Sequence, residues 1–156
     1  MNKYITKLLI PTMTKIVPFF VLLVVACSTP KTSVLKTSFD TLYQSTTNGA
    51  EVPGSLHITN NEDFMQLIET LNIDATEFNS FATVDFKEND VVVLYQGQKK
   101  SGGFSIEITS VSWDDEVLLI KKLEKSPGKG EMVTLALTAP YCIVQIPKAP
   151  KIKIIE

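Results

Sequence analysis

The most constraining feature of this sequence is the apolar run Val91–Tyr95 and the alternating segment that follows it. The run is rich in β-branched residues and contains no charge, which is typical of a strand buried on both faces. A polar connection, Gly97–Gly103, comes next. Phe104, Ile106 and Ile108 then alternate with polar residues, as in a strand with one face in water. Together these segments predict two strands joined by a loop at the centre of a β-rich domain.

Further strand-like segments follow one another at short intervals, with turn residues between them. Asn48-Gly49, Asp114-Asp115 and Ser126–Gly130 are the clearest turn and loop signals. Because short connections join antiparallel neighbours, we predict an α+β fold that is mostly β, an antiparallel β-sandwich or open barrel of about seven strands with one packed helix. The other predicted strands are Phe39–Tyr43, Ser55–Ile58, Glu116–Leu123, Met132–Leu137, Tyr141–Ile146 and, at a sheet edge, Lys151–Ile155.

One segment, Thr59–Asn72, has the pattern of an amphipathic helix. Thr59 and Glu62 have the spacing of a capping box, in which a hydroxyl and a carboxylate satisfy free amides at the start of the helix. One face is apolar, and we expect it to pack on the sheet. Its residues are Phe64, Leu67, Ile68 and Leu71. The next segment, Ile73–Lys87, predicts a loop whose aromatic residues cap one end of the core. These are Phe78, Phe81 and Phe86.

The charge of the chain argues against a nucleic-acid partner. All 15 basic residues are lysines, so the chain lacks the guanidinium fork that normally recognises phosphate. The formal net charge is −2, and removing residues 1–26 takes away three lysines and no acid, which leaves −5. A mildly acidic domain without arginine is a poor nucleic-acid binder.

The N-terminal region has the order of a bacterial export signal. Residues 1–15 contain three lysines and no acid, and Ile16–Ala26 is a continuous apolar run that is too short for a stable membrane span. The run ends in Val24-Val25-Ala26-Cys27, which resembles the lipobox of bacterial lipoproteins, with mild departures at the two valines. In that family the cysteine is lipidated and becomes the first residue of the mature chain. The alternative is a plain signal peptide in which Cys27 is incidental.

The lipobox resemblance and the composition of the chain together predict three parts. These are a lipoprotein signal peptide at residues 1–26, an acylated Cys27 with a flexible tether at residues 27–38, and a single globular domain at residues 39–156. Ser28–Ser38 is rich in Ser, Thr and Lys, as flexible tethers are. Several acyl chains hold a protein firmly in the lipid bilayer, because each buried methylene contributes about 0.8 kcal/mol. An aspartate after the lipidated cysteine is the usual signal for retention in the inner membrane, and here the residue is Ser28. We therefore expect the protein to be anchored in the outer membrane, facing the periplasm.

No constellation of residues predicts catalysis, a metal site or a cofactor. The one histidine, His57, has no nucleophile motif around it, and we expect it at the surface or in a capping role. With Cys27 acylated, His57 and Cys142 are the only soft candidate ligands, too few for zinc. Cys142 lies in an apolar segment, and we expect it to be buried as a small hydrophobic residue. We therefore expect a protein that is not an enzyme.

Three segments carry short motifs in a fixed order. Val91–Ile108 is a buried strand followed by G-x-K and S-G-G-F-S-I, Ser126–Gly130 is a Pro-Gly loop, and Ala139–Lys148 contains P-Y-x-I-V-x-I-P. This succession resembles the C-terminal domain of the protease complex subunit PrcB family, over about residues 85–156. Members are often short bacterial lipoproteins or secreted proteins, and the name-giving one accompanies a surface serine-type protease. The resemblance implies an accessory protein more than it implies a mechanism.

The loops alone have a second resemblance. Chagasin-type inhibitors of cysteine proteases present three loops from an immunoglobulin-like sandwich, and Ser101–Phe104, Pro127–Gly130 and Ala139–Tyr141 come in the same order. The first of these lacks the expected Asn-Pro-Thr, and Ala139 stands where an arginine is expected. The order also follows from any sandwich that has three loops at one end.

We therefore expect a lipid-anchored, non-enzymatic protein of the bacterial cell envelope that binds another envelope protein, such as a protease. A protease inhibitor is the alternative. Loops on a rigid β scaffold are where binding residues concentrate, although Gly102-Gly103 and Pro127-Gly128 also suit purely structural turns. The candidate protein-binding residues are Lys99, Lys100, Ser101, Gly102, Gly103, Phe104, Pro127, Gly128, Pro140 and Tyr141.

Overall fold

The computed structural model describes residues 35–74 and 83–156. The chain divides into two units, Met1–Pro30 and Lys31–Glu156, and the second holds all of the described residues. The predicted signal segment, Cys27 and most of the predicted tether lie outside the described residues, as do Phe78 and Phe81.

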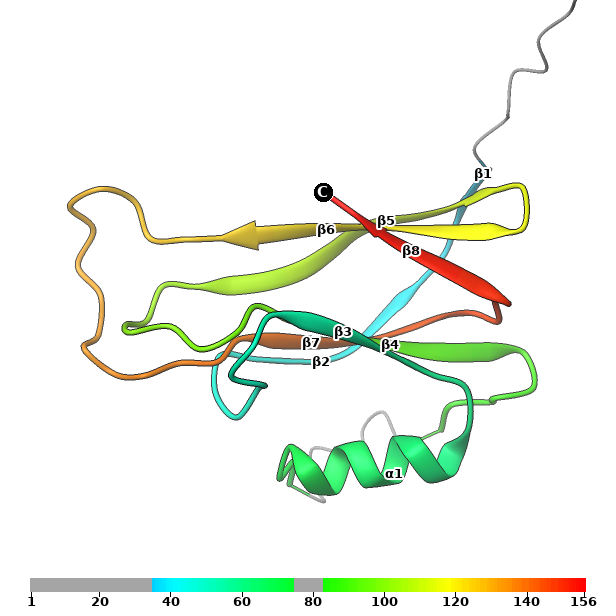
Figure 1. Cartoon of the computed structure of the whole chain (residues 1–156), viewed down its shortest axis with the longest axis horizontal. Helices are drawn as coiled ribbons and strands as arrows, with labels where there is room; N and C mark the ends of the chain where they lie inside the picture. Colours follow the sequence, from blue (N-terminus) through cyan, green and yellow to red (C-terminus); the bar gives the residue numbers. More distant parts are fainter. Residues whose placement is uncertain (1–34, 75–82) are drawn as a thin grey trace, which may run out of the picture. The chain divides into compact units, whose positions relative to one another are not determined.

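Eight strands in the described part of the chain form two four-stranded sheets (Figure 1). In sheet A the order is β1-β5-β6-β8, with β1 at Leu35–Thr37, β5 at Ser105–Asp114, β6 at Val117–Lys125 and β8 at Lys151–Ile155. In sheet B the order is β2-β7-β4-β3, with β2 at Asp40–Ser45, β7 at Tyr141–Pro147, β4 at Asn89–Tyr95 and β3 at Gly54–Ile58. The predicted sandwich is thus confirmed as two separate open sheets.

Neighbouring strands are antiparallel with one exception. β8 pairs with β6 in parallel, in register from Val117 with Lys151 to Lys121 with Ile155. The chain reaches β8 directly from β7, which lies in the other sheet, so the last strand crosses between the layers. β8 is confirmed as an edge strand of sheet A.

The two central strands of sheet B are buried on both faces, as predicted for Val91–Tyr95. Val92 and Leu94 of β4 face sheet A, whereas the alternate residues of the same strand face the helix. β7 does the same, with Cys142 and Val144 on one side and Ile143 on the other. A strand in the middle layer of three has no side in water, which explains its uninterrupted apolar sequence.

The first core fills the space between the sheets. Its buried members are Val92, Leu94, Ile106, Ile108, Val111, Leu118, Ile120, Cys142, Val144, Ile146 and Ala149, with Phe39, Trp113, Ile152 and Ile154 packed at its margin. In β5 the predicted alternation is confirmed, because Ile106 and Ile108 point inward while Thr109 is exposed.

The second core lies between sheet B and helix α1, which spans Asn61–Thr70. The predicted apolar face of the helix is confirmed as its buried face. Phe86 also packs against this core, edge-on to Phe64 with the ring centroids 5.9 Å apart, as predicted for a capping aromatic. The buried members are Ile58, Phe64, Leu67, Ile68, Leu71, Val91, Val93, Tyr95, Tyr141 and Ile143. Within the described residues, no helix is long and apolar enough to cross a membrane.

The start of α1 differs from the predicted capping box. Asn60 is the N-cap, and its side-chain oxygen accepts a hydrogen bond from the Asp63 amide at 2.9 Å. Asparagine is a better N-cap residue than threonine, which explains why the helix is capped by Asn60 and not by Thr59. Asp63 then adds a carboxylate to the first turn, where the helix dipole favours it.

Two predictions of local structure were wrong. Leu35–Thr37, which we placed in the tether, form β1 and pair with β5 from Val111 to Trp113. Met132–Leu137, which we predicted as a strand, is an irregular loop. Its three largest apolar side chains point into solvent, so no sheet neighbour or core is available to make the segment a strand.

Candidate protein-binding surface

Three loops meet at one end of the fold, on the left in Figure 1. They are residues 46–53 between β2 and β3, residues 97–104 between β4 and β5, and residues 126–140 between β6 and β7. We call this end the loop face. The third loop lies between the other two and is bonded to both of them. Segments that are far apart in the sequence thus form one surface.

Backbone hydrogen bonds fix the second and third loops to each other. The amide of Lys99 donates to the carbonyl of Thr138 at 2.7 Å, and the amide of Thr138 donates back at 3.0 Å. The Thr138 hydroxyl donates to the carbonyl of Ser101 at 2.8 Å, and the Gly102 amide donates to the carbonyl of Thr134 at 2.9 Å. These bonds do for the loop what a strand ladder does for a sheet, because they satisfy its backbone polar groups.

The first loop is held in the same way. The Gly49 amide donates to the Ala139 carbonyl at 3.0 Å, and the Ala139 amide donates to the Thr46 carbonyl at 2.8 Å. The Gln98 amide donates to the Glu51 carbonyl at 2.9 Å. Sequence reasoning found the turn at Asn48-Gly49 but did not place this loop beside the others, since no local pattern reports which loops share an end of a sandwich.

Two predicted glycines have a steric reason to be glycine. Gly103 has φ +86°, and a Cβ there would lie 3.1 Å from both Pro127 and Val133. At Gly102 a Cβ would collide with the Thr134 hydroxyl. The Gly-Gly pair therefore lets the third loop approach the second closely, and both the structural and the binding interpretations of this pair remain compatible.

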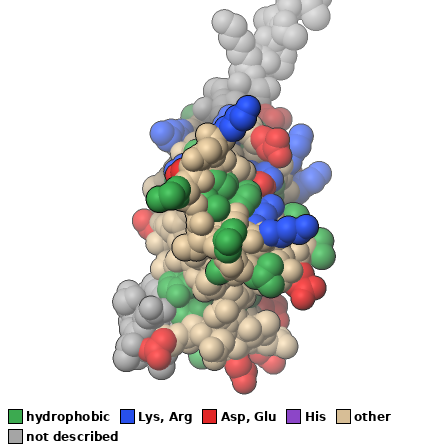
Figure 2. All heavy atoms as spheres, turned by 90° about the vertical axis from the view of Figure 1, so that its left-hand side faces the viewer, with side chains coloured by type: hydrophobic (Ala, Val, Ile, Leu, Met, Phe, Trp, Pro, Cys, Tyr) green, Lys and Arg blue, Asp and Glu red, His purple; other side chains and the backbone are tan. Residues whose placement is uncertain are grey.

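The third loop presents large apolar side chains to solvent. Met132 is 98% exposed, Leu135 is 96% exposed and Leu137 is 66% exposed. Figure 2 shows this end of the fold, with hydrophobic side chains at the surface and lysine side chains beside them. Lys100 in the second loop and Lys129 in the third loop are also exposed. Single exposed apolar residues are common on proteins, but three within six positions on one bonded loop are a local concentration of exposed apolar side chains.

Most of the predicted site residues lie on the loop face. Lys100, Gly103 and Gly128 are exposed, and the Lys99 ammonium lies over the Phe104 ring at 5.5 Å from its centroid. Four residues are half-buried in this face: Ser101, Gly102, Phe104 and Pro127. The apolar residues of 132–137 were missed as site residues because an apolar run with β-forming residues predicts a strand.

Pro140 and Tyr141 do not belong to the exposed surface. Pro140 is buried, and its carbonyl accepts a hydrogen bond from the Gln96 amide at 2.9 Å. Tyr141 is 1% exposed and packs in the second core, with its ring 6.0 Å from Tyr43 and 6.2 Å from Tyr95. Their placement among the exposed binding residues is corrected, because Tyr141 begins a strand that is covered on both sides.

Two glutamines join the sheets beneath the loop face. Gln96 donates from Nε2 to the Lys125 carbonyl of sheet A at 3.1 Å, and Gln44 donates from Nε2 to the Ile106 carbonyl at 2.8 Å. Gln96 is 2% exposed, so its bond lies in a region of low dielectric where such bonds are strong. These two hydrogen bonds therefore hold the two sheets together directly beneath the loop face.

His57 has a different role from the predicted one. Its Nε2 lies 3.0 Å from Oδ2 of Asp90, a carboxylate that is 1% exposed. The same oxygen accepts the Ala149 amide at 3.1 Å, and the Lys148 ammonium lies 3.6 Å from the other oxygen. The pair ties β3 to β4 and to the turn before β8. The sequence signal that was available, a polar residue next to an apolar strand, does not reveal such a partner.

Cys142 is the remaining residue that the sequence offered as a chemical candidate. Cys142 is a buried free cysteine, and burial raises the pKa of its thiol to about 12. A thiol with so high a pKa has almost no thiolate at neutral pH and is a poor nucleophile. No group of three or more metal-binding side chains occurs in the described parts of the chain.

Residues 91–147 match the family model described as PrcB C-terminal. The matched residues run from β4 through the second and third loops to the end of β7, so this part of the chain is similar to a PrcB C-terminal domain. A search of curated proteins found no match, and a search of solved structures found none. The matched segment contains the second and third loops of the loop face.

Proposed function

We propose that this chain, with its PrcB C-terminal domain, is a lipid-anchored protein of the bacterial envelope that binds another protein through the loop face. In this proposal the protein has no catalytic activity and serves as an accessory subunit, for example of a protease. The loop face supports the binding role, and the similarity to a PrcB C-terminal domain over residues 91–147 is consistent with it.

The single observation that carries the proposal is the exposure of Met132, Leu135 and Leu137 on a loop that is bonded on both sides. Leaving three large apolar side chains in water gains the folded monomer nothing. A partner that covers them would recover about 1.5–3 kcal/mol for each side chain that becomes fully buried. Because the loop is already held in place, little conformational entropy is lost on binding.

The anchoring part of the proposal rests on the lipobox-like Val24-Val25-Ala26-Cys27. Acylated Cys27 would hold the chain at the bilayer, with the described domain beginning eight residues later at Leu35. Replacement of Cys27 by serine should move the protein from the membrane fraction to the soluble fraction and abolish incorporation of labelled palmitate. A chain that stays in the membrane fraction without its cysteine would contradict the anchor.

The binding part is tested by crosslinking the full chain in native membranes and identifying what it retains. The variant M132S/L135S should lose the retained protein while it keeps its thermal midpoint, since both side chains are already in water. The matched control is M65S/L123S, which removes two side chains that are 46% and 42% exposed elsewhere. If both variants retain the same proteins as the unchanged chain, the loop face is not the binding surface.

The alternative proposal, a protease inhibitor that uses three loops, has less support. Its third loop would be Ala139–Tyr141, and Tyr141 is buried in the second core. We expect the full chain at micromolar excess to leave the rates of cysteine and serine proteases unchanged. Inhibition that M132S/L135S removes would favour the inhibitor over the accessory subunit.

A further inference from the structure

The strand β3 is an edge of sheet B without the features that usually protect a sheet edge. Of the other edges, β1 has three residues and carries Lys36, β8 carries the exposed Lys151 and Lys153, and β2 has a register shift between Thr41 and Tyr43. Short length, lysines and bulges all discourage a second strand from pairing. β3 has five residues, Gly-Ser-Leu-His-Ile, with no lysine, and its register with β4 is unbroken. Among the described residues, β3 pairs only with β4.

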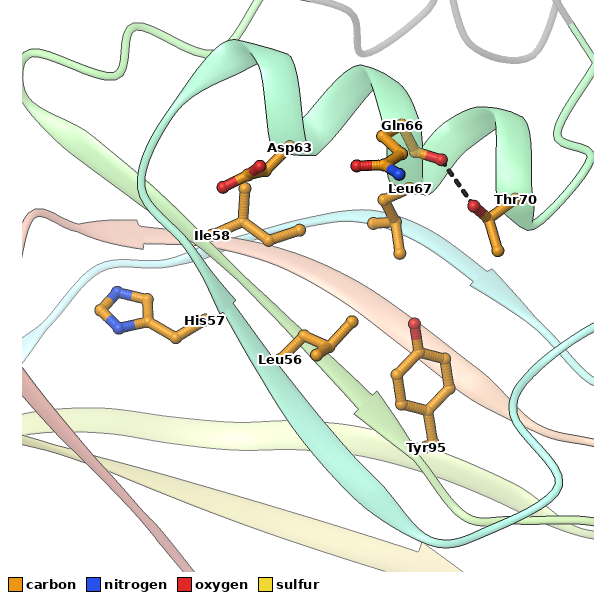
Figure 3. A pocket seen from close by; sticks show the side chains of 8 residues that line it. All are labelled: Leu56, His57, Ile58, Asp63, Gln66, Leu67, Thr70 and Tyr95. Carbon is orange, nitrogen blue, oxygen red and sulfur yellow. Dashed lines mark hydrogen bonds between the residues drawn. The ribbon is translucent and has the colours of Figure 1, made fainter.

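A pocket opens beside this edge, between β3 and α1 (Figure 3). Its volume is about 320 Å³, and Leu56, Ile58 and Leu67 give it apolar walls. Leu56 is 47% exposed, so part of the apolar surface is open to a ligand. In Figure 3 the Tyr95 hydroxyl points toward the helix, whereas His57 points away from it. The polar residues that complete the lining are His57, Asp63, Gln66, Thr70 and Tyr95.

A second pocket lies next to the start of the same strand. It has a volume of about 270 Å³. Its lining residues are Pro53, Gly54, Ser55, Leu94, Tyr95, Ile106, Lys122 and Ile154. Leu94 and Ile106 belong to the core between the sheets, whereas Ile58 and Leu67 of the first pocket belong to the core under the helix. The two pockets therefore flank β3 on opposite faces of sheet B.

This arrangement fits a strand better than it fits a compact ligand. Successive side chains of a strand point to opposite faces of its sheet. A segment paired with β3 would place one side chain toward the pocket beside α1 and a neighbouring one toward the other pocket. Main-chain hydrogen bonds would supply affinity and the pockets would supply specificity, which is the general mode of strand addition.

The charges around the first pocket select the kind of segment. All three charged residues of α1 are acidic, namely Glu62, Asp63 and Glu69, and all are exposed. Asp63 lines the pocket, and no lysine lines it. A partner with a Lys or Arg beside its apolar residue would therefore be attracted, and an acidic partner would be repelled.

We propose that the edge of β3 binds an extended segment of another protein, in which apolar residues alternate with polar ones and at least one is Lys or Arg. This proposal does not depend on Met132, Leu135 and Leu137, although Pro53 of the loop face also lines the second pocket. A second copy of this chain fits less well. Two β3 edges paired about a two-fold axis would place both acidic helices on the same face of the joined sheet, where they repel each other.

The probe is a displayed library of random ten-residue peptides, selected on the full chain in detergent. We expect enriched peptides to show apolar alternation and at least one basic residue, and to bind more weakly as salt rises. Methylation of alternate backbone nitrogens of an enriched peptide should reduce its affinity about tenfold or more, because a methylated amide cannot pair with the strand.

Two variants and one matched control locate the site. L56E should lower the affinity of the chain for the enriched peptides about tenfold or more, and D63K should lower it about threefold to tenfold. Leu56 is exposed, so the thermal midpoint of L56E should change little. D63K removes the first-turn carboxylate that accepts a hydrogen bond from the Asn60 side chain, so its midpoint should fall, and binding is measured well below both midpoints. L123E is the control, since Leu123 is 42% exposed and lies in β6.

Four outcomes would overturn the proposal. They are a library that yields no enriched peptide, enriched peptides without basic residues, equal binding to the unchanged chain and L56E, and unchanged binding after backbone methylation. Self-association of the full chain that L56E abolishes and that enriched peptides do not displace would assign the edge to a second copy instead. Loss of crosslinked protein in M132S/L135S has no bearing on these measurements, so the two proposals fail separately.

Discussion

Asp90 shows how one buried carboxylate can hold several segments of this fold together. It is the only carboxylate among the buried residues of the described chain. It bonds to the His57 side chain and to the Ala149 amide, and Lys148 completes the cluster by also donating to the Phe86 carbonyl at 2.6 Å. A buried charge needs such partners because its desolvation is otherwise costly. The cluster closes the end of the fold opposite the loop face.

Removal of this carboxylate should therefore be far more damaging than removal of a surface charge. We expect Asp90→Ala to lower the free energy of unfolding by about 3 kcal/mol, since it leaves buried donors without an acceptor. Glu124→Ala is the control, because Glu124 forms a half-exposed pair with Lys122 and should cost less than about 1 kcal/mol. Urea titration of both variants measures the difference, and equal losses would contradict the assigned role of Asp90.

Cys142 provides a second test at the scale of one residue. Burial raises the pKa of its thiol to about 12 from an ordinary value of 9.0, so the folded chain should hold about a thousandfold less thiolate at neutral pH. Alkylation followed by mass spectrometry of the peptide that contains Cys142 should show protection in the native protein and rapid labelling in urea. Rapid native labelling would contradict its burial.

The same shift gives a direction for stability against pH. As pH rises from about 9 toward 12, the unfolded chain loses the thiol proton while the folded chain keeps it. The raised pKa therefore stabilises the fold fully below pH 9, and this contribution falls as pH rises toward 12. In the Cys142→Ala variant, the free energy of unfolding measured by urea titration should therefore fall less steeply between pH 9 and pH 12 than in the unchanged chain.

At the scale of single elements, the helix start distinguishes two capping arrangements. Asn60 accepts the Asp63 amide, so Asn60→Ala should lower the free energy of unfolding by about 1 kcal/mol. Thr59→Ala should change it by less than about 0.5 kcal/mol, because the threonine does not cap. Thermal unfolding of the two variants measures both values. A larger loss for Thr59→Ala would restore the capping box.

Elements with long-range burial were the ones that sequence patterns predicted well. Val91–Tyr95 and the apolar face of α1 owe their patterns to two covered sides and one covered side respectively, and those patterns are visible in the residues themselves. β1 was missed because three residues of mixed polarity carry no periodicity, and only β5 makes them a strand. Met132–Leu137 has the composition of a strand, but no strand of the described fold lies beside it.

At the scale of the whole molecule, β4 and β7 couple the two cores. Both strands supply residues to each core, so a loss of packing in one is felt by the strands that build the other. The fold should consequently unfold as one cooperative unit, even though it consists of three layers.

We expect Val93→Ala, which enlarges the core under the helix, to lower the free energy of unfolding by about 2 kcal/mol. Trp113, the one tryptophan, lies at the margin of the other core and reports on sheet A. Its fluorescence and the hydrogen exchange of α1 amides should shift to the same urea midpoint. Separate midpoints would show that the layers unfold independently. Leu135→Ala, at a position that is 96% exposed, is the control and should shift neither.

The candidate site was predicted in part for a reason that also belongs to this scale. Loops 97–104 and 126–130 were recognised by their glycines and proline, which act locally. The contribution of residues 46–53 and the burial of Tyr141 depend on which strand ends come together, and this is decided by the order β2-β7-β4-β3. The pocket beside β3 depends on the same order, since that order makes β3 an edge.

The short strand β1 gives the fold a mechanical release point. In the anchored state that we propose, tension between membrane and domain reaches β1 before any other described element. β1 is held by three residue pairs with β5, whereas Phe39, two residues later, packs against the core between the sheets. Peeling β1 from its neighbour would lengthen the tether by about 10 Å and leave both cores closed. A partner that moves away from the membrane could thus extend the tether without unfolding the domain.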